Sequence, residues 1–268
     1  MKKGKVWGKK LVAGIMMAAI VLGNAAVSTQ AATKDSRKTV AVIKEDNYRK
    51  TLCKGFLGKS YGSVVDGIRC DCSGYTRAAL NRLESKGKSG TALKNVQVGA
   101  RCTRDWVSGS SITYTTGVAE DDDISWAKKT KLSIGKKSSG ASKVSDLELG
   151  DVVVYGRGSS TTHIAVYFGK FSSIGEVKSY LEDLGLYKSN TLKKVSGNKY
   201  QYNGKTVIRK YGNSSYWRIH STCSGIMIDN DIAGSSPYTS SFGNWKWTFS
   251  SGIDIIEEKM YVKVLNSY

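Results

Sequence analysis

The chain has 268 residues, with 41 Lys and Arg against 22 Asp and Glu, and a formal charge of +19. A basic protein attracts anionic partners, but the basic residues are scattered and form no Arg-rich arm or RNA-binding motif, so nucleic acid is not an expected partner. The single proline excludes a Pro-rich linker. The length allows one domain with a substantial hydrophobic core.

The first 31 residues have the pattern of a secretory signal peptide. Five lysines within residues 1–10 precede an apolar run at 11–23 and a small, polar segment at 24–32. The apolar run is shorter than the roughly 20 residues that cross a bilayer, which favours cleavage after Ala31 over an uncleaved membrane anchor. The remaining chain keeps a charge of about +14. We expect it to be exported, without stable membrane insertion, and to meet anionic wall polymers or lipid head groups.

Five cysteines follow the signal peptide, and export permits disulfides among them. An odd number leaves at least one thiol free. The Cys70-Asp71-Cys72 spacing is not the CxxC of redox or zinc motifs, so no metal is expected. If Cys72 is a nucleophile, the other four could form two disulfides or none; they are Cys53, Cys70, Cys102 and Cys223.

In chain order, residues 32–45 are polar and are interpreted as a linker, followed by one domain at 46–268. Apolar residues at helical spacing predict helices at 46–58, 72–86 and 174–185. Asp71 is a suitable N-cap for the second helix, and Gly87 a suitable stop. Residues 88–145 are rich in Ser, Gly and Thr. We expect loops and short strands there, with one helix near 123–129.

Strand patterns dominate the second half of the chain. The segments DVVVY at 151–155 and THIAVYF at 162–168 predict a hairpin, and further strands are predicted at 216–220, 225–229 and 260–265. Residues 186–215 are polar. Helices that precede a run of antiparallel strands indicate the α+β class.

Cys72 is the candidate nucleophile. It lies at the predicted start of a helix, where unpaired backbone N–H groups and the helix dipole stabilise an anion. This position is expected to lower the thiol pKa. The small neighbours Ser73 and Gly74 leave room for a substrate. From helix position alone, a buried structural cysteine remains the alternative.

His163 and His220 are the only histidines of the chain, and a thiol nucleophile needs a base. His163 shares a strand face with Ala165, whose small side chain leaves room for another element, such as the catalytic helix. His220 ends a later strand. A nucleophile, a base and a polar residue that orients the base form a catalytic triad.

Four segments, in this order, resemble the NlpC/P60 cysteine peptidases. The nucleophile motif is Tyr61-Gly62 followed by Asp71-Cys72-Ser73-Gly74-Tyr75; the other segments are LGDVVVY at 149–155, HIAVYFG at 163–169, and RIHS at 218–221 with GIMI at 225–228. The resemblance implies a papain-like α+β core with a catalytic helix packed on an antiparallel sheet. Two insertions, at 88–145 and 170–215, depart from the family pattern, and the second separates the histidines by 57 positions.

The resemblance also implies residue roles. Cys72 would be the nucleophile, with its backbone N–H in the oxyanion hole, His163 the general base and acid, and His220 the orienting residue. Substrate binding is assigned to Tyr61, Asp71, Ser73 and Gly74. The family's Trp-Gly-Gly after the tyrosine is absent, and Tyr61-Gly62-Ser63 stands in this chain.

The implied substrate is the stem peptide of peptidoglycan, cut at an amide bond through a thioester without any cofactor. The protein would then be a secreted monomer at a bacterial cell wall, with peptidoglycan and anionic wall polymers as partners. Two alternatives keep the same fold. One is an amidase or acyltransferase on another substrate, and the other is an inactive cell-wall-binding protein.

Overall fold

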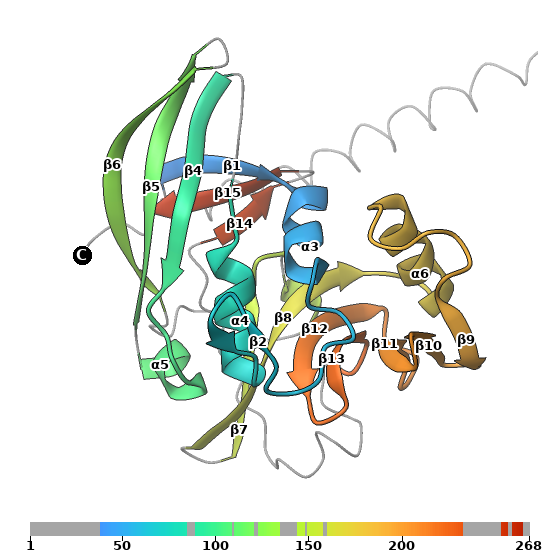
Figure 1. Cartoon of the computed structure of the whole chain (residues 1–268). Helices are drawn as coiled ribbons and strands as arrows, with labels where there is room; N and C mark the ends of the chain where they lie inside the picture. Colours follow the sequence, from blue (N-terminus) through green and yellow to red (C-terminus); the bar gives the residue numbers. More distant parts are fainter. Residues whose placement is uncertain are drawn as a thin grey trace, which may run out of the picture. The chain divides into compact units, whose positions relative to one another are not determined.

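The structure is a computed structural model that describes residues 38–84, 89–108, 110–120, 123–134, 144–147, 149–157, 160–232, 253–256 and 259–264. Nearly all of these residues fall in one compact unit, Thr39–Val264. The fold is mixed α/β, with a large sheet and few helices in the described ranges (Figure 1). The predicted signal peptide lies outside the described residues. Within those ranges, no helix has the length and apolarity needed to cross a membrane.

A seven-stranded sheet forms the centre of the fold (Figure 1). In spatial order its strands are β7 (Val152–Arg157), β8 (Ser160–Lys170), β12 (Tyr216–Thr222), β13 (Gly225–Asp229), β11 (Lys205–Arg209), β10 (Lys199–Tyr202) and β9 (Lys193–Ser196). Neighbouring strands are antiparallel except β11 and β13, which are parallel. The hairpin predicted at 151–168 and the strands predicted at 216–220 and 225–229 are confirmed.

The three predicted helices are present but shorter. They are α3 (Glu45–Cys53), α4 (Cys72–Asn81) and α6 (Ile174–Asp183). Glycines with positive φ follow α3 at Gly55 and Gly58 and follow α6 at Gly185, a backbone conformation that ends a helix. The predicted N-cap of α4 is confirmed, because the Asp71 carboxylate accepts the Gly74 N–H at 2.7 Å.

The core lies between α4 and one face of the sheet. Ile164, Val166 and Phe168 of β8 belong to the same buried cluster as Tyr75 and Ala79 of α4. Burial of these larger apolar side chains favours this face for the helix.

Ala165 and Tyr167 instead join a second cluster, which contains Tyr155. The expectation that Ala165 makes room for the catalytic helix is therefore wrong. Successive side chains of a strand point to opposite faces, and the helix occupies the face opposite to Ala165.

The first insertion is mostly strand. β4 (Ser89–Val98), β5 (Ser110–Glu120) and β6 (Asp123–Ile134) form a three-stranded antiparallel sheet, and α5 (Thr103–Ser108) lies between the first two. The helix expected near 123–129 is therefore wrong. Those residues pair with β5 along their whole length, so the neighbouring strand supplies the backbone partners that a helix would supply internally.

The second insertion, 170–215, contains α6 and strands β9 to β11. A further three-stranded sheet has the order β1 (Lys38–Lys44), β15 (Lys259–Val264) and β14 (Ile253–Ile256), so the end of the segment interpreted as a linker forms a strand. β2 (Val64–Val65) and β3 (Ile68–Arg69) form a small hairpin before α4.

Gly74 permits a close approach between α4 and β3, because a Cβ atom there would lie 1.8 Å from the Arg69 carbonyl oxygen. We expect Gly74→Ala to lower the free energy of unfolding by about 1–3 kcal/mol, since the backbone has to move. Gly175→Ala, in the first turn of α6, is the matched control, because the new methyl group meets nothing nearer than the Ser173 hydroxyl at 3.6 Å. Urea unfolding measures both variants, and equal losses would contradict the close approach.

Candidate active site

Cys72 is the first residue of α4, and backbone contacts hold this end of the helix in place. The Ser221 hydroxyl of β12 donates to the Cys70 carbonyl oxygen at 2.9 Å, and the Gly62 N–H donates to the same oxygen at 3.0 Å. The start of α4 is thereby tied both to the sheet and to the loop that carries Tyr61.

The Cys72 thiol is half-buried, and burial raises its pKa, with a further rise from the Asp71 carboxylate. Backbone hydrogen bonds from Ser73, Ile164 and Cys72 itself act in the opposite direction, as expected near a helix start. The backbone amides at the helix start lower the thiol pKa as predicted, but burial outweighs them, so the expectation of a net lowered pKa is wrong. The resting thiol is protonated and needs a base.

His163 of β8 and His220 of β12 form a hydrogen-bonded pair. Their side chains meet at 2.8 Å between His163 Nε2 and His220 Nδ1, and the rings are 5.0 Å apart in an edge-on arrangement. The Tyr155 ring stacks on His163 with centroids 5.6 Å apart. Burial lowers the pKa of both histidines, that of His163 well below its usual value. Both imidazoles are therefore neutral at neutral pH.

Asp229 of β13 continues this pair into the core. Its Oδ2 lies 2.8 Å from His220 Nε2, and its Oδ1 accepts the Arg218 Nε–H at 2.7 Å. Burial alone would raise the pKa of this carboxyl group, but Arg218 and His220 outweigh burial and hold it well below its usual range. The Arg218 guanidinium is also buried and contacts Asp231 at 3.3 Å and the Tyr155 hydroxyl at 2.7 Å.

The ionised Asp229 determines which group donates and which accepts in each hydrogen bond from Asp229 through His220 to His163. A carboxylate only accepts hydrogen bonds, so His220 Nε2–H must donate to it. Neutral His220 then has an accepting Nδ1, to which His163 Nε2–H donates. Neutral His163 consequently carries its lone pair on Nδ1. This tautomer is the one that a general base requires.

A pocket of about 240 Å³ brings these groups together with Cys72. The backbone N–H of Ile164, the residue after His163, contacts the Cys72 thiol. The pocket is lined by Cys72, His163, His220, Asp229, Tyr61 and Cys223, among others. His163, His220 and Asp229, which lie 91, 148 and 157 positions after Cys72 in the sequence, therefore share one cavity with the nucleophile candidate.

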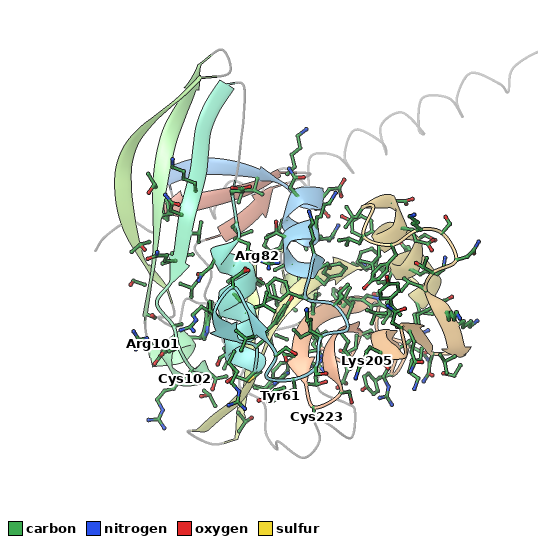
Figure 2. All side chains as sticks on the ribbon, in the orientation of Figure 1. Tyr61, Arg82, Arg101, Cys102, Lys205 and Cys223 are labelled. Carbon is green, nitrogen blue, oxygen red and sulfur yellow. The ribbon has the colours of Figure 1, made fainter. Side chains whose placement is uncertain are left out.

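Tyr61 enters the pocket from the loop after α3, and its side chain is 46% exposed. Two backbone bonds fix this loop on β13: Gly58 N–H donates to the Ile226 carbonyl, and Ile226 N–H donates to the Lys59 carbonyl. Burial raises the Tyr61 pKa despite a hydrogen bond with the Cys72 backbone. Figure 2 shows Tyr61 beside Cys223, in agreement with their shared pocket.

The other predicted substrate-binding residues have their polar groups engaged in the helix cap. The Ser73 hydroxyl donates to the Asp71 carboxylate at 3.0 Å, and the Gly74 N–H donates to the same oxygen. None of these three residues is among those that line the pocket. The structure thus brings Cys72, His163, His220 and Tyr61 together in one pocket. A direct role of Asp71, Ser73 and Gly74 in binding substrate stays a prediction.

All five cysteines carry free thiols. Cys53 and Cys70 are buried, whereas Cys102 and Cys223 are exposed. Within the described ranges, no group of His, Cys, Asp or Glu side chains has the arrangement of a metal site.

Asp229 and Arg218 were not predicted as site residues, although the sequence contains a signal for them. The two-residue turn between Thr222 and Gly225 sets Arg218 opposite Asp229 and makes Asp229 a diagonal neighbour of His220. A register deduced from that turn would have identified the pair.

No protein-family model matches the chain, and searches of curated proteins and of solved structures give no match either. A function for this protein therefore has to be inferred from the geometry of the pocket and from the resemblance of the four sequence segments.

Alkylation of Cys72 by iodoacetamide is expected to increase with pH, with a midpoint above the ordinary thiol value of about 8.5. Asp71→Asn should move this midpoint to lower pH, because it removes a negative charge that raises the thiol pKa while an asparagine still caps the helix. Mass spectrometry of the Cys72 peptide measures the rate, with exposed Cys102 as the internal reference. A wild-type midpoint below about pH 8.5 would contradict the raised pKa of Cys72. An unchanged midpoint in the variant would contradict the contribution of Asp71 to it.

Proposed function

We propose that the protein is a cysteine hydrolase of the NlpC/P60 type that cleaves amide bonds in the stem peptides of peptidoglycan. The observation that carries this proposal is the hydrogen-bonded series Asp229, His220 and His163, which ends in the pocket that contains the Cys72 thiol. A buried carboxylate that orients a neutral imidazole is the arrangement that activates a protonated nucleophile.

In the proposed reaction, His163 Nδ1 takes the thiol proton as the Cys72 sulfur attacks the carbonyl carbon of the substrate. The developing oxyanion accepts the Cys72 backbone N–H, next to the Tyr61 hydroxyl. The C–N bond breaks as His163 returns the proton to the leaving amine, which leaves a thioester. Water then attacks the thioester with His163 again as base, and the acid product leaves with the thiol restored.

The imidazolium that forms transiently is stabilised through the same contacts. His220 accepts the His163 Nε2–H, and the Asp229 carboxylate holds His220 in the accepting tautomer. Asp229 is therefore proposed as a positioning residue rather than a catalytic one, because the hydrogen bonds of its carboxylate within the described part of the chain go to His220, Arg218 and the Asp231 backbone.

Several features support the papain-like core and the substrate. α4 packs on the antiparallel part of the sheet, in which the neighbouring strands β8 and β12 carry the two histidines. Tyr61 lines the pocket and is exposed, so a substrate can reach it from solvent. The predicted export signal would bring the protein to a cell wall. An acyltransferase on another substrate would share the thioester but use an amine or alcohol in place of water, so product masses separate the two reactions.

Cys72→Ala should abolish release of new amino groups from purified peptidoglycan, with a loss of at least about 10³-fold, because no thioester can form. Cys223→Ala removes another thiol from the same pocket and should keep most of the activity. Dinitrophenylation of released amines and mass spectrometry of the fragments provide the measurement. Undiminished release by Cys72→Ala would refute the nucleophile assignment.

Asp229→Asn should lower kcat by about 10²–10⁴-fold with little change in KM, because the amide can donate to His220 Nε2 and reverse the tautomers of both histidines. Asp231→Asn is the matched control, since Asp231 forms an ion pair with Arg218, whereas Asp229 contacts both Arg218 and His220. We expect Asp231→Asn to lower kcat less than tenfold. Circular dichroism checks that both variants fold, and similar kcat losses in the two would show that Asp229 acts only through the ion pair.

A further inference from the structure

A second pocket, of about 360 Å³, lies between the end of α3 and the segment that joins α6 to β9. Two lysines, Lys50 and Lys54, and two tyrosines, Tyr187 and Tyr202, are among the residues that line it. None of these residues belongs to the candidate active site.

The two tyrosines supply an aromatic wall. Their rings are 5.0 Å apart at an interplanar angle of 63°, and Tyr202 is 39% exposed. Burial raises the pKa of the Tyr187 hydroxyl, so both the ring and the hydroxyl are uncharged near neutral pH. Such a ring offers an apolar face together with a polar tip, which suits a polyol or sugar that carries both CH and OH groups.

The charge around this pocket has a single sign over a long stretch of sequence. No Asp or Glu occurs between Asp183 and Asp229. Besides the buried Arg218 of the active-site cluster, this stretch contains seven basic residues: Lys188, Lys193, Lys194, Lys199, Lys205, Arg209 and Lys210. Every residue of the edge strand β9 is exposed, including Lys193 and Lys194. In the described part of the chain, Lys50, Lys54 and Lys205 form no ion pair with a carboxylate. The exposed Asp183 is the acidic residue nearest in sequence to this stretch.

The pocket and the candidate active site flank the same loop. Gly55 and Leu57 line the second pocket, and Tyr61, a few residues later, enters the catalytic one. Lys205 packs over this loop, because its Cβ lies 3.5 Å from the position of a Cβ on Gly58. In Figure 2, Lys205 appears on the same side of the molecule as Tyr61 and Cys223.

We propose that this second pocket, with the lysines of β9 to β11 around it, binds a phosphate-bearing polyol or sugar chain. Lysine ammonium groups bind phosphates as point charges, and the tyrosine rings contact the carbon backbone between successive phosphates. A chain held there would lie beside the loop that carries Tyr61. This binding requires no chemistry at Cys72, so it and the proposed hydrolysis can fail separately.

Exposed edge lysines also prevent strands of different molecules from pairing. Reversing the charge separates this role from phosphate binding, because a glutamate still prevents strand pairing but repels a phosphate. Lys54→Glu with Lys205→Glu keeps a charged surface but reverses its sign in the pocket, at Lys54, and over the adjacent loop, at Lys205. Lys44→Glu with Lys170→Glu makes the same change in net charge at two exposed lysines outside the pocket. The probe is a lipid-free poly(glycerol phosphate), titrated into the purified protein in a calorimeter at two salt concentrations.

We expect the wild type to bind this polymer, with an affinity that falls as salt rises, and the pocket variant to bind at least about tenfold more weakly. The matched variant should bind within about threefold of the wild type. Tyr202→Ala should also weaken binding, because it removes the aromatic ring without changing the charge. Tyr202→Phe keeps the ring and should retain binding. Hydrolysis by the Tyr202 variants of peptide fragments that lack phosphate should stay at the wild-type rate.

Equal weakening in both lysine variants would overturn the proposal, because net charge alone would then account for the affinity. Binding of phosphatidylglycerol vesicles without binding of the polymer would also overturn it and would indicate a lipid surface instead. Loss of polymer binding in Cys72→Ala would show that the polymer occupies the catalytic pocket rather than this one.

Discussion

The buried ion pair between Arg218 and Asp229 is the constraint on which the rest of the site depends. Removing two charges from water is costly, and such a pair persists only when its geometry satisfies every donor and acceptor. Here the Asp231 carboxylate and the Tyr155 hydroxyl each accept a further hydrogen bond from the guanidinium. Because Asp229 stays ionised, His220 and His163 each have one permitted tautomer. The same pair joins β12 to β13 and supports the Tyr155 ring that stacks on His163.

The nucleophile candidate combines two opposing influences. Backbone N–H groups at the start of α4 favour a thiolate, but the half-buried position and the adjacent Asp71 favour a protonated thiol, and burial has the larger effect. In the proposed hydrolysis, a sulfur in this state requires the lone pair of His163, much as a hydroxyl nucleophile requires its base. The proposal therefore assigns the reactivity of Cys72 to the whole series of hydrogen bonds and not to the helix end alone.

Close contacts at backbone carbonyl groups hold the elements of the site together. Gly74 allows α4 to touch the Arg69 carbonyl, Ser221 binds the Cys70 carbonyl, and Gly225 lies where a Cβ would come within 2.7 Å of the Lys59 carbonyl. The segment 170–215 between the two histidines does not disturb this arrangement, since β8 and β12 are direct neighbours in the sheet. Its last strand, β11, adds in parallel to β13 and carries the basic surface on the same sheet.

The sequence by itself determined the three helices, the hairpin of β7 and β8, the Asp71 cap and the order of cysteine and histidines, because these follow from local periodicity and turn residues. For residues 88–134 it predicted loops, short strands and one helix, and not the three long paired strands that the structure has. These Ser-, Thr- and Lys-rich segments are stabilised by pairing with one another and by packing of Val96, Val98 and Ile112 in the main core. Two properties were decided by tertiary structure alone. Burial, which no local pattern reports, raised the Cys72 pKa, and the pairing of β12 with β13 brought Asp229 to His220 and fixed which nitrogen of His163 carries the lone pair.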